Sequence, residues 1–150
     1  MDTMKENHRW LQKQSIEIRL PTSIGGYSQM GRFFRLRRPV VGWKKTCIRN
    51  PYLLYVITKL TIPTDTWVYS HENYDKKRAE FAIVESSYII SNNYKRHKDY
   101  VEVSTSLFDT GFKYRHGNLV MPSKAFSFYD DVCESGIHFY LTEREAINHF

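Results

Sequence analysis

The stretch VVGWKKTCIRNPYLLYVITKLTIP, residues 40–63, decides the fold of this chain. Both of its halves are rich in β-branched and aromatic residues, a composition typical of strands. Asn50 and Pro51 form a turn signal between the halves, and Pro63 ends the second half because proline lacks the amide hydrogen that a sheet needs. The stretch predicts two strands at the centre of a sheet, over residues 40–48 and 52–62.

Alternation of apolar and polar residues with period two recurs on both sides of this pair. It predicts strands over residues 15–20, 78–90 and 100–108. A loop with Pro21, Gly25 and Gly26 follows the first of these strands. The polar residues 91–99 predict a hairpin with a long loop between the other two, and residues 112–120 predict a small hairpin of their own.

One helix is predicted, and it lies at the C-terminal end. Thr142 and Glu145 have the spacing of a capping box, in which each side chain bonds an amide of the other residue. The helix is expected from about residue 143 to the terminus, with Ala146, Ile147 and Phe150 on the face that packs against the sheet. Residues 1–15 are polar and predict an N-terminal arm.

These elements predict an α+β fold, a mainly antiparallel β-sheet with one C-terminal α-helix, in a single β-rich domain over residues 16–150. The 150 residues and 17.9 kDa match the size of one domain, and 41% of the residues are hydrophobic. No apolar run approaches the ~20 residues that span a bilayer. The longest covers residues 52–57, and the N-terminus lacks the apolar core of a signal peptide. A cytosolic protein without membrane contact is expected, with Cys47 and Cys133 as thiols; a single disulfide between them is the alternative.

The net charge of +6 is unevenly distributed along the chain. Between Glu17 and Asp65 there is no acidic residue, whereas nine residues are basic: Arg19, Arg32, Arg35, Arg37, Arg38, Lys44, Lys45, Arg49 and Lys59. Phe33, Phe34 and Trp43 are interleaved with them. Such a segment suits nucleic acid, an anionic ligand or an acidic protein face. The alternative is a solvated basic face without a partner, and no known nucleic-acid-binding motif is present.

Residues 133–146, CESGIHFYLTEREA, form the most distinctive stretch of the chain. We interpret it as a structural element, the corner where a strand meets a helix, and not as a catalytic site. Gly136 permits a close backbone approach or a special turn, residues 137–141 form a strand, and the helix follows. Cys133 is expected to be a small buried residue.

Cys133 and His138 also raise two chemical alternatives. Together with Cys47 they form three possible zinc ligands, and by themselves they form a possible nucleophile and base. The C-x-x-C spacing of zinc sites is missing, however, and nothing supplies a third orienting group. Phosphate-binding, dinucleotide-binding and hydrolase motifs are also absent. No metal, cofactor or catalytic residue is therefore predicted, and His138 is expected to be a hydrogen-bonded structural residue.

Five segments, in this order, resemble a domain of unknown function found in phages and large DNA viruses. They are GWKK (42–45), VITKLTIP (56–63), KKRAEFAIV (76–84), FKYRHGNLVMP (112–122) and the stretch 133–146. The similarity covers roughly residues 40–150. It implies a viral origin, and it supplies no established activity. The related domains often follow pentapeptide repeats, which are absent from this chain, and they have a cysteine where this chain has Lys77. That departure weakens a metal site built on shared cysteines.

Three function classes follow. The first is a non-enzymatic viral interaction or virion protein, in the host cytoplasm or the virion, whose basic and aromatic N-terminal half binds an acidic protein surface. The second binds nucleic acid or a nucleotide-like ligand, with cations on phosphates and Trp43 or Tyr114 on bases. The third is an enzyme with an unrecognised site around His138. The candidate binding residues are Arg32, Arg35, Arg37, Arg38, Trp43, Lys44, Lys45, Arg78, Tyr114 and His138.

Overall fold

The computed structural model describes residues 3–17, 31–49, 51–90 and 99–149. The last part of the strand predicted at 15–20, the loop at 21–26 and most of the connection at 91–99 lie outside these residues.

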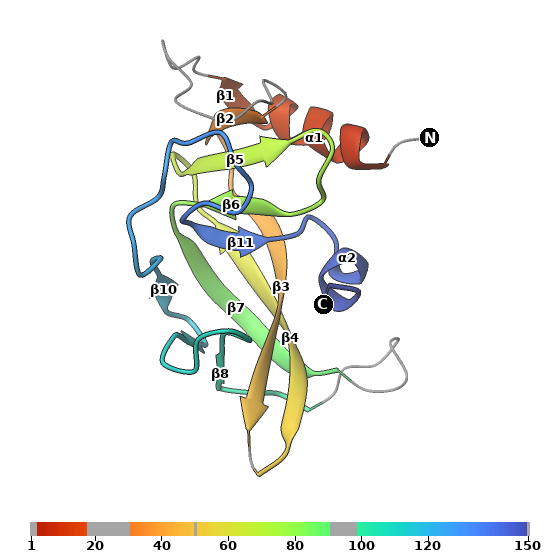
Figure 1. Ribbon diagram of the computed structural model, residues 1–150, viewed down its shortest axis with the longest axis vertical. Helices are drawn as coiled ribbons and strands as arrows, with labels where there is room; N and C mark the ends of the chain where they lie inside the picture. Colours follow the sequence, from red (N-terminus) through yellow and green to blue (C-terminus); the bar gives the residue numbers. More distant parts are fainter. Residues whose placement is uncertain (1–2, 18–30, 50, 91–98, 150) are drawn as a thin grey trace.

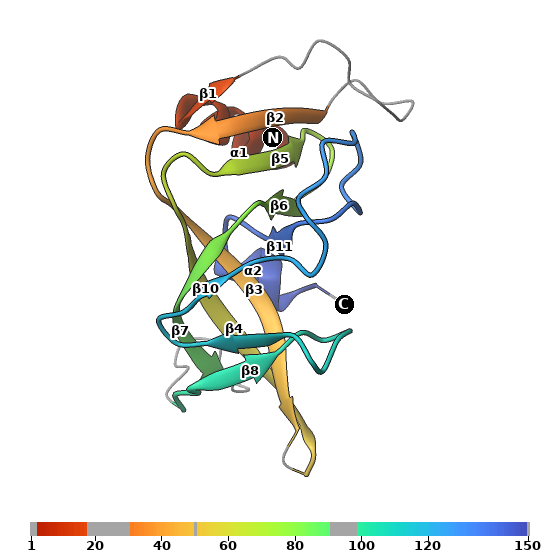
Figure 2. The ribbon, with the colours of Figure 1, turned by 90° about the vertical axis from the view of Figure 1, so that its left-hand side faces the viewer.

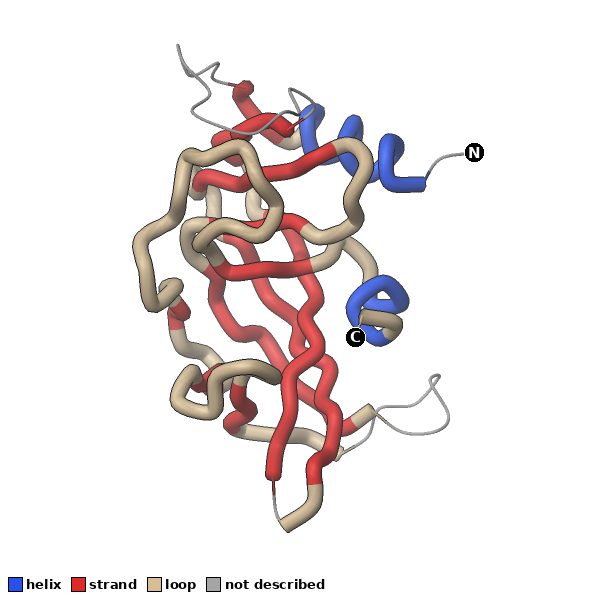
Figure 3. The backbone as a smooth tube through the Cα atoms, viewed as in Figure 1, coloured by secondary structure: helices blue, strands red, loops and turns tan. Residues whose placement is uncertain are grey.

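Within the described residues the chain forms two helices and eleven strands (Figures 1 and 3). In chain order they are α1 (Thr3–Lys13), β1 (Ser15–Glu17), β2 (Gly31–Leu36), β3 (Val40–Arg49), β4 (Leu53–Ile62), β5 (Trp67–His71), β6 (Lys77–Ala79), β7 (Ala82–Ile89), β8 (Val103–Thr105), β9 (Lys113–Arg115), β10 (Leu119–Val120), β11 (Ile137–Phe139) and α2 (Glu143–Ile147).

The strands form two sheets. Sheet A has the order β1-β2-β5-β6-β11, and sheet B has the order β10-β7-β4-β3-β8-β9. All of the pairings between these strands are antiparallel. The two sheets meet just after β11, where Trp43 and Tyr140 exchange two backbone hydrogen bonds of 2.8 Å. The prediction of a mainly antiparallel β fold with a C-terminal helix is confirmed.

The hairpin predicted from residues 40–63 is the centre of sheet B. β3 and β4 pair over their whole length, from Val40 opposite Ile62 to Arg49 opposite Leu53. β7 and β8 flank the pair on its two sides. Figures 1 and 2 show the tip of this hairpin at the end of the molecule opposite α1.

The main core lies between the two sheets and draws side chains from both. Phe34 and Val68 come from sheet A, Leu60 and Val84 come from sheet B, and Phe139 comes from β11. These five side chains are almost completely buried. Tight packing explains Gly42 on β3, because a Cβ atom there would lie 2.7 Å from the Phe139 ring.

The N-terminal segment differs from the predicted arm. Residues 3–13 form α1, which packs beside sheet A (Figure 1). Leu11 is buried in the main core. His8 of the same helix forms a 2.9 Å hydrogen bond between its Nδ1 and the Ser70 hydroxyl. The segment folds because these few side chains find partners on a sheet that follows much later in the chain.

Two other segments are divided differently than predicted. The strand predicted at 78–90 breaks at residues 80–81, since β6 pairs within sheet A and β7 pairs within sheet B. Residues 112–120 do not form a hairpin of their own. β9 pairs with β8, and β10 pairs with β7, so the turn between them connects the two outer edges of sheet B.

The helix α2 begins where it was predicted and is shorter than expected. The Thr142 hydroxyl accepts a hydrogen bond from the Glu145 backbone nitrogen, which confirms the N-cap. The helix ends at Ile147, and Phe150 lies outside the described residues. Among the described residues, neither helix has the length and apolar character needed to cross a membrane.

Candidate functional site

The structure divides the basic segment into separate regions. Arg32 and Arg35 are exposed on β2, and Arg37 and Arg38 are exposed in the turn that leads to β3. Arg35 lies near Asp65, with Nε 3.7 Å from a carboxylate oxygen. Arg32 and Arg35 are three residues apart on β2 and therefore point to opposite faces of sheet A, so the four exposed arginines do not form one cationic face.

The aromatic residues beside these arginines are buried, so they are not exposed together with them. Phe34 faces the main core and contacts His8 of α1, at a ring distance of 5.4 Å. Phe33 points to the other side of the sheet and packs against Phe126 and Phe128, at 6.1 and 5.3 Å. Phe33 and Phe34 are both buried because sheet A is covered on both faces. The arginines and phenylalanines of this segment therefore do not form the single surface that the sequence suggested.

The Arg78 guanidinium forms hydrogen bonds within the protein. Its side chain is fully buried, and the guanidinium donates hydrogen bonds to four backbone carbonyls of the loop that precedes β11, those of Ser127, Tyr129, Asp131 and Ser135. The rings of Tyr69 and Phe126 lie 4.5 and 4.8 Å from it. Burial lowers the pKa of Arg78 to about 10, which leaves it charged at neutral pH. Arg78 holds this loop, and four of its five N–H donors are used in doing so.

Gly136 lies at the end of the same loop and permits the predicted close approach. A Cβ atom there would lie 2.9 Å from the Arg78 Cβ and 3.2 Å from the carbonyl oxygen of Ala79. The loop also explains Cys133, which is exposed. The prediction that Cys133 is buried was wrong, because the loop lies on the surface of the sheet.

Lys77 is fully buried. Its ammonium group donates a 2.7 Å hydrogen bond to the Tyr74 carbonyl. Burial lowers the pKa of Lys77 to about 8, although the charges of Glu145 and Asp75 oppose the shift. In this chain the position therefore stabilises the turn between β5 and β6.

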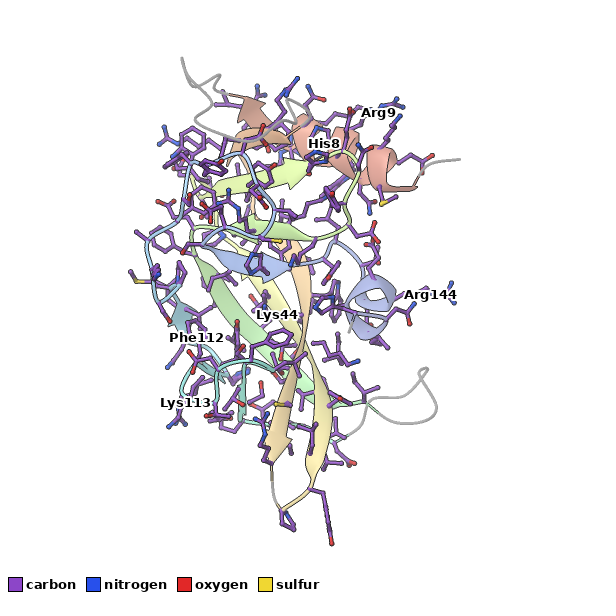
Figure 4. All side chains as sticks on the ribbon, viewed as in Figure 1. His8, Arg9, Lys44, Phe112, Lys113 and Arg144 are labelled. Atoms are coloured by element: carbon purple, nitrogen blue, oxygen red, sulfur yellow. The ribbon has the colours of Figure 1, made fainter. Side chains whose placement is uncertain are left out.

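Three of the predicted residues, Lys44, Tyr114 and His138, come together at one cleft. They belong to β3, β9 and β11, which lie far apart in the sequence. The cleft has a volume of about 480 Å³, and the rest of its wall comes from the segment between β8 and β9 and from the loop before β11, which includes Cys133. Figure 4 shows Lys44 near the middle of the molecule, between Phe112, which also lines the cleft, and Arg144 of α2.

Lys44 donates a 2.9 Å hydrogen bond to the carbonyl of His138, and its Nζ lies 5.9 Å from the centroid of the Tyr114 ring. Burial, with a smaller effect from Lys76, lowers the pKa of Lys44 to about 8. At neutral pH most molecules therefore carry an ammonium group here.

His138 has the structural role that the sequence indicated. Its Nε2 lies 3.2 Å from the Val132 carbonyl, which can only accept, so Nε2 carries the proton. Burial, with Lys44 and Lys76 nearby, lowers the pKa of His138 to about 4 and keeps it neutral at pH 7. Within the described residues His138 and Cys133 share no hydrogen bond, and no group of three potential metal ligands occurs.

Lys45 and Trp43 lie on the α2 side of β3. Lys45 donates to the carbonyls of Ile147 and His149, at 3.2 and 3.1 Å, and so caps the end of α2. Trp43 is partly buried and packs against the small second core that includes Tyr140 and Ala146.

The tip of the β3–β4 hairpin is an exposed surface that was not predicted from the sequence. The four consecutive side chains of Tyr52, Leu53, Leu54 and Tyr55 are exposed by 79, 46, 40 and 46%. Among the described residues the ladder between β4 and β7 begins at Val56, and Figure 1 shows the hairpin tip beyond the ends of β7 and β8. The signal was visible in the sequence: an apolar run without alternation, directly after the Asn50-Pro51 turn.

A family model described as "Family of unknown function (DUF5758)" matches residues 27–146. This confirms the predicted resemblance to a domain of unknown function, and it extends the resemblance to β2. No curated protein and no solved structure matches the chain.

Proposed function

The chain belongs to the family of unknown function DUF5758, and we propose that it is a non-enzymatic interaction protein that binds an acidic protein partner through the tip of the β3–β4 hairpin. One observation carries the proposal: four consecutive large side chains, Tyr52–Tyr55, are exposed where the hairpin projects from the body. Large apolar side chains that are exposed together on one projecting element often mark a protein interaction site.

The charge at the tip supports an acidic partner. Arg49 is exposed at the end of β3, opposite Leu53. The Lys45 ammonium lies 4.4 Å from the centroid of the Tyr55 ring. No acidic residue occurs between Glu17 and Asp65, so the hairpin carries only positive formal charges. An apolar centre with cations beside it is complementary to an apolar patch with carboxylates at its rim.

The backbone of the tip also favours a protein. On β4, residues before Tyr55 have no ladder partner on the β7 side among the described residues. A projecting two-stranded ribbon of this kind gains backbone hydrogen bonds when a partner adds a strand to its edge. The resemblance to phage and large-DNA-virus domains supports a viral origin, with the host cytoplasm or the virion as the place of action.

The test begins with site-specific photo-crosslinking from Tyr52 of the full chain in cells that express it. A cross-linked protein is then purified, and its affinity for the wild type is measured by calorimetry. The double variant Leu53→Ser/Leu54→Ser is expected to reduce the binding free energy by about 2 kcal/mol or more, as is usual for central interface residues. Arg49→Glu is expected to weaken it and to reduce its salt dependence.

Val41→Ser is the matched control. Val41 lies on the same hairpin, is 43% exposed, and is far from the tip. An acidic partner that is lost with the double leucine variant and kept with Val41→Ser supports the proposal. Equal affinities for all of these variants would refute it. Binding of the tip to anionic lipid vesicles would refute the proposal and identify a membrane as the partner. Dimers in sedimentation that depend on the tip would refute it and identify a second copy of the chain.

A further inference from the structure

The cleft at Lys44 lies away from the hairpin tip and has features of a built ligand site. Its volume of about 480 Å³ is within the usual range of small-molecule pockets. Its walls come from sheet B, from the end of sheet A and from the loop that Arg78 anchors. Because the Arg78 guanidinium bonds that loop at several carbonyls, the wall is held in place before any ligand arrives.

Lys44 has unused hydrogen-bonding capacity at this cleft. An ammonium group carries three donors, and within the described residues Lys44 makes one hydrogen bond, to the His138 carbonyl. A second polar group in the wall has no partner at all among the described residues. It is the hydroxyl of Tyr114, a residue that is only 3% exposed.

An unsatisfied hydroxyl in so buried a residue costs free energy, which a bound acceptor would recover. Lys44 and Tyr114 both line the cleft, and the Lys44 ammonium lies 5.9 Å from the centroid of the Tyr114 ring, so the two residues are close enough to contact the same small ligand. Both groups are donors at neutral pH, and they therefore select an acceptor.

The remaining lining indicates what else the ligand contains. Phe112, which contacts Tyr114 at a ring distance of 5.2 Å, offers a partly exposed apolar surface. Asp109 and Glu134 also line the cleft, and their carboxylates accept from hydroxyl groups. We propose that the cleft binds a phosphate- or carboxylate-bearing organic molecule of about mononucleotide size, with its anionic group held by Lys44 and Tyr114.

The test measures binding to the purified full chain by calorimetry. The probes are adenosine 5′-monophosphate, adenosine, inorganic phosphate and benzoate. Lys44→Met removes the charge and keeps most of the length of the side chain, and Tyr114→Phe removes only the hydroxyl. Each is expected to weaken binding of the anionic probes by about tenfold, as for hydrogen bonds to charged groups. Lys113→Met is the control, because Lys113 is exposed on β9 next to Tyr114 (Figure 4).

The probes separate the two sources of the anionic group. Tighter binding of the monophosphate identifies phosphate, tighter binding of benzoate identifies a carboxylate, and either result supports the site. Adenosine bound as well as its monophosphate would overturn the proposal. So would an absence of binding by every probe at millimolar concentration, or affinities that Lys44→Met and Tyr114→Phe leave unchanged.

A measurement on the wild type guards against variants that do not fold. The groups that face Lys44 are Lys76, His138 and Tyr114, with Asp109, Lys124 and Glu134 further along the cleft. His138 is already neutral above pH 7. Affinity for the anionic probe is therefore expected to fall as the pH rises through about 8, where Lys44 loses its proton. Constant affinity from pH 7 to pH 9.5 would contradict the assignment of Lys44.

Discussion

At the scale of single residues, the buried cations of this protein serve different purposes. The guanidinium of Arg78 is planar and presents its donors as a fork, and here that fork meets carbonyls of residues 127–135. Loops without regular structure have many unpaired backbone groups, and one arginine satisfies four of them. Among the described residues Lys44 bonds one carbonyl, that of His138, so it keeps donors for a ligand where Arg78 uses most of its own.

We expect Arg78→Lys to destabilise the protein by about 3 kcal/mol or more, the cost of breaking a buried charge network. A lysine keeps the charge and cannot reach carbonyls on several sides. Urea unfolding measures the loss, and hydrogen exchange is expected to accelerate over residues 127–135. Arg115→Lys, at an exposed position on β9, is the control. If both variants unfold at the same urea concentration, the anchoring role of Arg78 is wrong.

At the scale of elements, α2 is too short to be stable by itself, and its contacts at both ends keep it helical. The Thr142 hydroxyl donates a 2.7 Å hydrogen bond to the Glu145 carboxylate while it accepts from the Glu145 backbone nitrogen. Asn7 of α1 also donates to that carboxylate, at 3.2 Å. At the other end Lys45 bonds the last carbonyls. A five-residue helix depends on such caps more than on propensity.

Thr142→Ala is therefore expected to lower the free energy of unfolding by about 1 kcal/mol, the usual value of an N-cap. Thr142→Ser keeps the hydroxyl and is expected to retain most of that stability. Chemical denaturation of the two variants beside the wild type measures the difference. An alanine variant as stable as the serine variant would show that the cap contributes nothing here.

At the scale of the whole molecule, α1 closes the open end of the main core. Leu11 is completely buried among side chains of both sheets, although Trp10 beside it is 45% exposed. Burial lowers the pKa of His8 to about 4, so this helix presents a neutral imidazole to Ser70 at pH 7. Helix α1 therefore contributes a side chain to the main core.

Leu11→Ala is expected to cost about 2–4 kcal/mol, because it leaves a cavity in the core. Trp10→Ala removes a larger side chain from the surface of the same helix and is expected to change stability by less than about 0.5 kcal/mol. Thermal or urea unfolding compares the two. A smaller loss for Leu11→Ala than for Trp10→Ala would mean that α1 does not dock as described.

Local patterns by themselves determined the β3–β4 hairpin and the start of α2. The hairpin depends on strand-forming residues on each side of Asn50-Pro51, and the cap depends on two residues three positions apart. These interactions form between neighbours in the chain, so the sequence contains all the information that they need.

Only the tertiary structure decided the rest. Phe33 and Phe34 become core because sheet A is covered on both faces, and residues 3–13 become a helix because Leu11 enters a core made by later strands. The cleft joins Lys44 to Tyr114 and His138, across strands whose pairing no local pattern specifies. Such contacts depend on residues far apart in the chain, and their energies follow from burial, which exists only after the sheets have packed together.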